Sequence, residues 1–485
     1  MKSELGLAGE EVGKWLKILE TETGNLETAI HWSHSGGDNE EGGKLATAYA
    51  NYWLNRGYLT TATYHLENIL QHEDKLSLST KGNLLGIKGL FLNMLGNADS
   101  AEELIGRSLS ISRELGNQDD IASGLNNLAS VVYEKGDYAK ARELIEETLE
   151  IDRATGDASK ISFSLINLGT VARLQGDYET ARALLEESLE IRKKAKNKFA
   201  IASSLNTLAI LHVNLGDYDK ARAYIEEGLA LTRELGNNYG IADGLGLLGN
   251  VEASLGNFEE SERLQRESLK IFEEMGKQNK IADAYSNIGN VSFQKGEYTS
   301  SLEHLSRALE IQRNIGDKFG IALTLLRMGK SHTAGKNYQE ALERIEESFA
   351  IRTKLGLKGG IAECHGVLGF LMMLTGRSAE AGSSYLKSME IYLELKNSSG
   401  IFSALLALSF ILLKREDLDS AKKLFGIAAA YRSLPGVGTE MFDKMIFSDI
   451  TELSPDLTTT LSKTSSELPA SDQLMSIVTE ILKGN

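Results

Sequence analysis

Proline and cysteine are scarce in this chain of 485 residues. Its three prolines, Pro435, Pro455 and Pro469, all lie beyond residue 434. Because proline breaks helix interiors, the first 434 residues are compatible with helices throughout. The single cysteine, Cys364, excludes an internal disulfide and fits a reducing compartment. We therefore expect a helical protein in the cytoplasm.

Long apolar runs and basic clusters are missing as well. No stretch has the length of a membrane span, and Glu4, Glu10 and Glu11 stand where a signal peptide needs basic and apolar residues. The net charge of -16 disfavours nucleic acid and anionic membranes as partners. The longest basic run, Arg192-Lys193-Lys194, falls at an expected helix C-terminus, where cations suit the helix dipole.

Repetition is what the sequence has in abundance. Gly-Asp-Tyr recurs at 136–138, 176–178 and 216–218, and isoleucine returns every 40 residues from Ile121 to Ile401. A fixed period of this length is typical of a solenoid. The pattern predicts an all-α, right-handed superhelix of about ten helix pairs, starting near residues 38, 77, 117, 157, 197, 237, 277, 317, 357 and 397.

One repeat, residues 118–156, shows how each pair is built. Ile121, Leu125, Leu128, Ala129 and Val132 form an apolar stripe on a first helix. Gly136-Asp137 ends that helix and opens a second, whose expected buried side is Ala141, Leu144, Ile145, Leu149 and Ile151. Two such helices cannot bury both stripes alone, so neighbouring pairs must complete the core.

The two ends depart from this period. Residues 8–35 read as two short helices around Thr23-Gly24-Asn25, and residues 436–485 as helices near 439–451 and 471–483 with a mobile link between them. We therefore expect an N-terminal helical cap at 1–37, the solenoid at 38–434 and a C-terminal tail at 435–485.

The repeat resembles the tetratricopeptide repeat. The residues that carry the likeness are Leu165, Leu168, Gly169, Gly176, Asp177, Tyr178, Ala181, Leu189 and Ile191. The spacing of 40 residues is similar to the long variant in kinesin light chains, spindle-orientation adaptors and bacterial regulators. The resemblance implies that the first helices line a concave groove that binds peptides.

The ends carry a second resemblance. Trp15, the run Glu22–Trp32, Leu45-Ala46, Trp53 and Arg56-Gly57 look like the helical segment after the winged helix of bacterial signalling ATPases, and Ala421–Ala429 is similar to their closing repeat. In those proteins the repeats form the sensing or partner-binding arm. This chain has no Gly-x-x-x-x-Gly-Lys-Ser/Thr loop, so the resemblance carries over no nucleotide switch.

No residue pattern predicts catalysis, a metal or a cofactor. Gly244–Gly249 matches the dinucleotide-binding fingerprint but falls inside an expected helix, so we interpret it as helix packing. His31 and His34 have the spacing of two metal ligands without a nearby third. Cys364 has no cysteine nearby, and His365 beside it is expected to point elsewhere on a helix, which disfavours a nucleophile. We predict that the chain is no enzyme.

A polar stripe runs along the first helices, opposite the apolar one. Asparagine is frequent there, and its amide both donates and accepts, as binding an extended peptide backbone requires; a solvated face is the alternative. The candidate binding residues are Asn126, Asn127, Ser130, Tyr133, Asn167, Thr170, Arg173, Asn206, Asn250, Asp283, Asn287, Asn290, Arg327 and Lys330. Of these, Arg173, Arg327 and Lys330 would select acidic groups.

Later repeats change the character of this stripe. Phe370, Met373, Phe410 and Leu413 replace its polar residues, which indicates either an apolar partner pocket or cover by the tail. We therefore expect a non-catalytic adaptor that takes a protein or peptide ligand in its groove and binds neither nucleic acid nor membrane. The alternative is the sensor arm of a bacterial signal-transduction ATPase or transcription regulator whose other parts lie outside this chain.

Overall fold

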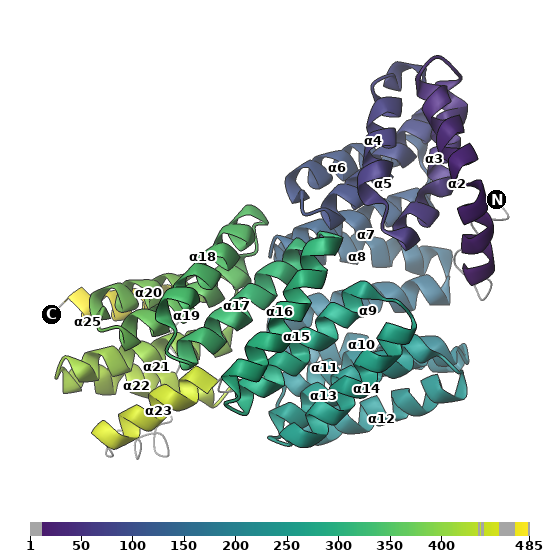
Figure 1. The fold of residues 1–485 in the computed structure, drawn as a ribbon. Helices are drawn as coiled ribbons and strands as arrows, with labels where there is room; N and C mark the ends of the chain where they lie inside the picture. Colours follow the sequence, from purple (N-terminus) through teal and green to yellow (C-terminus); the bar gives the residue numbers. More distant parts are fainter. Residues whose placement is uncertain (1–11, 435–436, 438–440, 455–470, 484–485) are drawn as a thin grey trace. The chain divides into compact units, whose positions relative to one another are not determined.

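The computed structural model describes residues 12–434, 437, 441–454 and 471–483, and all regular structure in these ranges is helical (Figure 1). The chain forms two compact units, Met1–Asp157 and Ala158–Asn485. Ten consecutive helix pairs, α3/α4 to α21/α22, fill the described part between residues 39 and 432, as the repeat predicts. None of the described helices is both long and apolar enough to cross a membrane.

In the first unit each helix packs against its neighbours in the chain. Its elements are α2 (Val12–His34), α3 (Asn39–Arg56), α4 (Leu59–Leu70), the 3-10 turn η1 (Glu73–Lys75), α5 (Leu78–Met94), α6 (Ala98–Leu115), α7 (Gln118–Glu134) and α8 (Tyr138–Thr155).

The second unit continues with pairs of first and second helices and adds two helices at its end. Its elements are α9 (Ala158–Leu174), α10 (Tyr178–Lys194), α11 (Lys198–Asn214), α12 (Tyr218–Glu234), α13 (Asn238–Ser254), α14 (Phe258–Glu274), α15 (Gln278–Gln294), α16 (Tyr298–Ile315), α17 (Lys318–Ala334), α18 (Tyr338–Lys354), α19 (Lys358–Leu374), α20 (Ser378–Glu394), α21 (Ser398–Lys414), α22 (Leu418–Arg432), α23 (Met441–Leu453) and α25 (Ser471–Lys483).

The repeat of 118–156 folds as its pattern predicts. Asp137 caps α8 by accepting a hydrogen bond from the backbone N–H of Lys140, and Gly156 ends α8 at φ 72°, a conformation that favours glycine. The five stripe residues of α7 are all buried. In α8, Ala141, Ile145 and Leu149 are buried while Leu144 and Ile151 are half-buried. Packing against neighbouring helices therefore completes the core of each pair.

The N-terminal prediction of two short helices is wrong. A single helix, α2, runs from Val12 to His34 with Gly24 in its interior, while residues 8–11 lie outside the described part. An interior glycine costs a helix only about 1 kcal/mol. Burial of Ile30 against a cluster that includes Trp53, and a 2.9 Å hydrogen bond between the hydroxyls of Thr23 and Tyr52, hold the helix together across that position.

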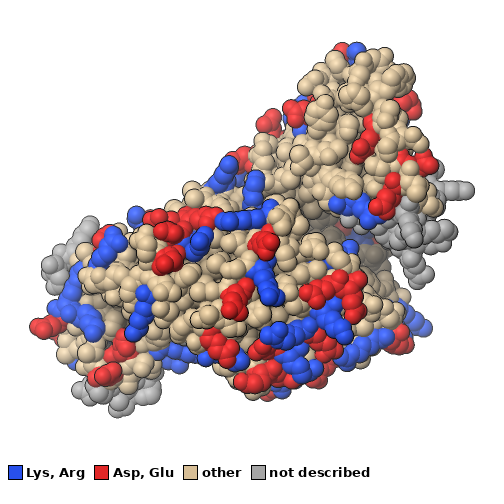
Figure 2. All heavy atoms as spheres, in the orientation of Figure 1, with Lys and Arg blue, Asp and Glu red and all other residues tan. Residues whose placement is uncertain are grey.

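The second helices carry charged side chains on their outer side. Figure 2 shows basic and acidic groups interleaved over the face drawn, and ion pairs link one pair of helices to the next. Arg113 meets Glu147 at 2.6 Å in the first unit, and Arg313 meets Glu347 at 2.7 Å in the second. Because these charged groups are exposed, each ion pair contributes at most about 1 kcal/mol to the stability of the fold.

The tail forms the two helices that the sequence predicts. They are α23 and α25, although residues 439–440 and most of the expected link, 455–470, lie outside the described part. Phe442, Ile446 and Ile450 of α23 are buried in the same apolar cluster as Phe370 and Phe410. The sequence suggested either an apolar partner pocket or cover by the tail for this apolar stretch, and the structure supports cover by the tail.

Candidate functional site

The polar stripe lies on the first helix of each pair. In the first unit its members on α7 are Asn126, Asn127, Ser130 and Tyr133, of which Ser130 is exposed and the other three are half-buried. The Oδ1 atom of Asn126 is buried without a hydrogen-bond partner in the described structure. This part of the stripe thus keeps hydrogen-bonding capacity that its own chain does not use.

In the second unit the stripe begins on α9 and α11. Asn167, Thr170, Arg173 and Asn206 are all half-buried there. The Nη1 atom of Arg173 donates to Oδ1 of Asn214 at 2.9 Å, which ties α9 to α11. The predicted arginine therefore has a neutral partner in its own chain, and its charge is not neutralised by that contact.

Four further predicted residues meet in one cavity of about 210 Å³, which we call the α13–α17 pocket. Its lining residues are Ala242, Asp243, Gly246, Leu247, Asn250, Gln265, Ser268, Phe272, Lys280, Asp283, Ala284, Ser286, Asn287, Gln312, Leu323 and Arg327. Asn290, on the same α15 as Asp283 and Asn287, is half-buried and lies outside this lining.

The basic groups of the α13–α17 pocket already bind acceptors of the chain. Lys280 Nζ lies 3.2 Å from Oδ1 of Asp243. Arg327 Nη1 donates to Oγ of Ser286 at 2.7 Å and, at 3.3 Å, to Oδ1 of Asn287. An acidic ligand would have to compete with these contacts for the two cations.

The acidic and amide groups of the same pocket are less well satisfied. Burial raises the pKa of Asp283, although Lys280 and Arg327 act in the opposite direction, and its carboxylate still reaches solvent. Gln265 and Gln312 are only 1% exposed, and the Oε1 atom of each lacks a hydrogen-bond partner in the described structure. The pocket therefore presents more free acceptors than free donors.

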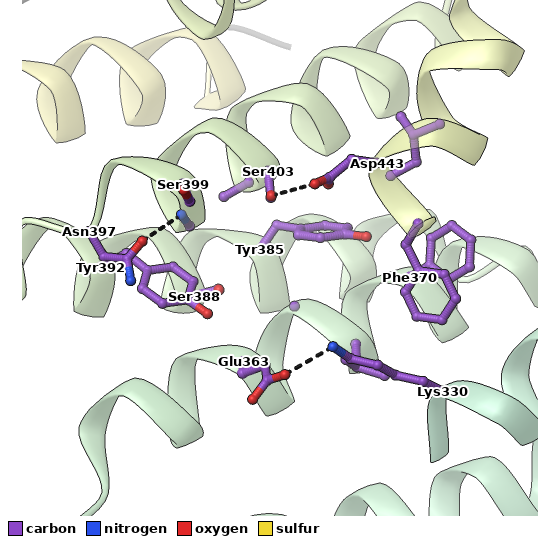
Figure 3. Close-up of a pocket in the computed structure, with 16 residues that line it drawn as sticks. Lys330, Glu363, Phe370, Tyr385, Ser388, Tyr392, Asn397, Ser399, Ser403 and Asp443 are labelled. Atoms are coloured by element: carbon purple, nitrogen blue, oxygen red, sulfur yellow. Dashed lines mark hydrogen bonds and ion pairs between the residues drawn. The ribbon is translucent and has the colours of Figure 1, made fainter. Parts of the chain in front are cut away.

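The next stretch of the stripe is covered by α23, and beneath that helix lies a second cavity of about 170 Å³, the α23-covered pocket (Figure 3). Lys330 Nζ meets Oε1 of Glu363 at 2.9 Å, and Arg352 Nη1 meets the other carboxylate oxygen at 3.0 Å. Burial alone would raise the pKa of Glu363, but these two cations outweigh it and lower that pKa. The predicted Lys330 is thus part of a three-residue ionic cluster.

α23 reaches the stripe through an aromatic side chain and a carboxylate. The Phe442 ring stacks on Phe370 with 4.1 Å between centroids, and it meets Phe293 edge-on at 6.0 Å. Asp443, 4% exposed, accepts a 2.9 Å hydrogen bond from the hydroxyl of Ser403. Phe293, Phe370 and Ser403 occupy the repeat positions of Tyr133, Ser130 and Ser123, so α23 lies on the predicted binding face.

Several residues of these two pockets were missed from the sequence, namely Gln265, Gln312, Tyr385, Phe442 and Asp443. For Gln265 and Tyr385 a signal exists, because other repeats carry isoleucine or leucine at that position. A polar or aromatic residue there interrupts the core pattern and marks a pocket. Phe442 and Asp443 lie outside the period, so no repeat position identifies them.

The remaining candidate motifs are structural. Gly244–Gly249 lies within α13, where a Cβ on Gly244 or Gly249 would come within 2.8 Å of a neighbouring side chain, which confirms the packing interpretation. Cys364 is buried, and burial raises the pKa of its thiol and disfavours a reactive thiolate. The ring centroids of His31 and His34 lie 5.0 Å apart, and no group of three His, Cys, Asp or Glu side chains that could hold a metal ion occurs among the described residues.

Several solved structures resemble this chain, and one of them, with a TM-score above 0.5, supports the fold. A Rap protein complexed with competence and sporulation factor is 15% identical, with 74% of this chain and 99% of that chain covered and a TM-score of 0.52. The signal-transduction ATPase with a tetratricopeptide repeat sensor from Pyrococcus horikoshii is 13% identical, with 81% and 67% covered and a TM-score of 0.44. The apo quorum sensor NprR from B. thuringiensis is 14% identical, with 72% and 96% covered and a TM-score of 0.45.

The sequence itself matches a family model. No curated protein matches the chain. The tetratricopeptide repeat model, in contrast, matches residues 82–154, 120–194, 200–274 and 280–354, which together span more than half of the chain. These segments coincide with the helix pairs from α5/α6 to α17/α18. The chain therefore belongs to the tetratricopeptide repeat family.

Proposed function

We propose that this protein is a non-catalytic interaction scaffold that binds a peptide or a helical segment of a partner protein along the face formed by its first helices. One observation carries the proposal: in the later repeats, the chain's own helix α23 lies on that face through Phe442 and Asp443. A face whose backbone accommodates a helix in one stretch offers the same backbone shape in another, where different side chains meet the partner.

The open stretch supplies groups that suit a peptide backbone. Asn167, Asn287 and Asn290 recur on the stripe of the second unit, half-buried but within reach of a ligand. Each amide offers donors and an acceptor to a passing peptide group. One protein of this fold, the Rap protein, has been solved in complex with competence and sporulation factor.

The partner in this proposal is a protein in the cytoplasm. A net charge of -16 opposes binding to phosphate-rich nucleic acid and to anionic membrane surfaces. It also favours partners that carry basic groups, since opposite charges speed association.

A degenerate nonapeptide library passed over the immobilised full-length chain tests the proposal. We expect retention that falls at least tenfold when Asn127, Asn167 and Asn287 are all changed to alanine, because the backbone contacts are lost. The melting temperature should stay nearly constant, since these side chains lie outside the core. The control is Asn314→Ala, an exposed asparagine on the second helix α16. Equal retention by the triple variant, or a large loss of stability, contradicts the assignment.

The second candidate function is the sensor arm of a bacterial signalling ATPase or transcription regulator. The run Glu22–Trp32 and Trp53, which carry that resemblance, belong to α2 and α3, and these helices pack around the fully buried Trp53. An ATPase or winged-helix segment encoded directly upstream would favour this function, and an unrelated upstream gene would disfavour it.

A further inference from the structure

We propose that the α13–α17 pocket binds a cationic N–H donor group, an ammonium or guanidinium, and that its source is a lysine or arginine side chain of the bound peptide. The choice of a peptide as the source rests on the proposed function. The chemistry of the pocket does not, because it follows from comparing this repeat with the others in the same chain.

The first comparison concerns Asp283. Two repeats later its position holds Glu363, whose carboxylate binds Lys330 at 2.9 Å and Arg352 at 3.0 Å. Around Asp283, the positions of these two cations hold Asn250 and Phe272. Asp283 makes no hydrogen bond or ion pair with any residue that the structure describes. The same backbone thus presents a carboxylate without the cations that neutralise it elsewhere.

The second comparison concerns Gln312. Arg192 occupies this repeat position three repeats earlier, and Arg352 occupies it one repeat later. Both direct Nη1 to the carbonyl oxygen eight residues on, in Ala200 and Gly360. The surrounding backbone therefore accommodates a guanidinium at this place. Gln312 places Nε2 there instead, 2.7 Å from where a Cβ on Gly320 would lie, and its Oε1 atom has no donor in the described structure.

The third comparison concerns Gln265. At its repeat position six other pairs bury an aliphatic side chain: Ile105, Ile145, Leu185, Ile225, Leu305 and Ile345. Gln265 Nε2 donates to the carbonyl oxygen of Gly246 at 2.8 Å and to Oδ1 of Asn250 at 2.9 Å. This orientation directs Oε1 away from both acceptors, and the atom is left without a donor in the described structure. A buried acceptor of this kind is destabilising until a donor reaches it.

Together these groups define the ligand by its chemistry. Asp283, Gln265 and Gln312 supply acceptors, whereas Lys280 and Arg327 already bind Asp243, Ser286 and Asn287. A cavity of about 210 Å³ holds a charged head group and part of its alkyl stem, since one water takes about 30 Å³. Ammonium and guanidinium groups donate three and five N–H bonds and accept none, so they match a wall of acceptors.

The test uses the full-length chain and two probes: agmatine, which carries a guanidinium and an ammonium group, and the degenerate nonapeptide library. We expect agmatine to bind in calorimetric titration where neutral butylurea does not, and retained peptides to be enriched in lysine and arginine. Asp283→Asn and Gln265→Leu should each weaken agmatine binding about tenfold or more, the effect of losing one hydrogen bond to a charged group. Asp219→Asn and Gln118→Leu, which make the same changes at exposed sites, should leave it unaltered.

A third pocket variant keeps the test valid if the other two unfold. Asn250→Lys places an ammonium where Lys330 stands relative to Glu363, so it should neutralise Asp283 from within and abolish agmatine binding. Its position is exposed, which makes it compatible with folding. Unfolding midpoints of all variants are measured alongside.

The outcomes separate this inference from the proposed function. Agmatine binding without peptide retention supports the cation-binding pocket with a free amine as the ligand, and it counts against a peptide-binding groove. Retention of peptides without basic enrichment, and without agmatine binding, overturns the cation-binding pocket and leaves the groove standing. Failure of both probes overturns both.

Discussion

Two stretches of one helical face behave differently in this protein. At the α13–α17 pocket the first helices present Asn250, Asp283 and Asn287 to solvent or to a half-open cavity. At the α23-covered pocket, the equivalent face presents Phe370 and is closed by a helix of the same chain. The backbone repeats, so the difference comes from side chains at a few repeat positions.

The comparison separates architecture from recognition. The core position of Leu125 and Leu205 holds leucine in most pairs, with Tyr285 and His365 as exceptions, and these side chains keep the helices in place. The residues of the stripe and of the pocket walls differ from repeat to repeat. These differences decide whether a polar group is hydrogen-bonded within the chain or stays available to a ligand. Glu363 and Asp283 illustrate the two choices, since one has two cations from its own chain and the other has none within bonding distance.

The largest effect is expected from removing the aromatic anchor of the covered stretch. Phe442→Ala should cost about 3–5 kcal/mol of the docking free energy of α23, because it deletes a buried ring stacked on Phe370. Hydrogen exchange of 441–453 should rise sharply. A synthetic peptide with the sequence of 441–453 should then bind the variant more tightly than the wild type, because its site is vacated.

The matched control for this change lies on the same helix. Leu453 is 50% exposed, so Leu453→Ala should leave the exchange of α23 and the peptide affinity within about twofold of wild type. If Phe442→Ala leaves the exchange of α23 unchanged, the covered stretch is not closed by that anchor. Agmatine binding at the α13–α17 pocket should be the same in both variants.

A smaller effect is expected from the ionic cluster beneath α23. Glu363→Gln should cost about 1–3 kcal/mol of stability, because it leaves Lys330 and Arg352 without their carboxylate. Since the cluster lowers the pKa of Glu363 below 4.5, its contribution is fully present above that pH and is lost as the pH falls further. Denaturation of both proteins at pH 7 and in steps below pH 4.5 measures the difference, which should shrink on acidification. A difference that grows on acidification contradicts this account.

Most of the fold was predictable because the same pattern of residues recurs in every repeat. Ile121 and its counterparts every 40 residues fix the first helices, and Gly136-Asp137 and its counterparts fix the turns. The N-terminal helix was mispredicted, because Gly24 there is a single residue without a repeat to interpret it. Packing around Trp53 decides the conformation of that segment.

For the candidate site, the sequence places the residues on one helix face, but it says less about what each of them contacts. The period places Asn250, Asp283 and Asn287 on one face, but whether a charge is satisfied depends on residues of other helices. Lys330 and Glu363 are 33 residues apart, and Gln265 reaches Asn250 from a second helix. Such partners follow from side-chain length and packing, which the period does not encode.

The smallest effect on stability has the opposite sign. Gln265→Leu restores the residue type of the other pairs and removes a buried acceptor that lacks a donor, so chemical denaturation should show a gain of about 1 kcal/mol. Gln118→Leu, the same change at an exposed site of α7, should alter stability by less than about 0.5 kcal/mol. A loss of stability would mean that the two hydrogen bonds from Nε2 make Gln265 a structural residue. A gain together with lost agmatine binding would show that the pocket keeps a polar group at the expense of stability, as binding sites do where function requires it.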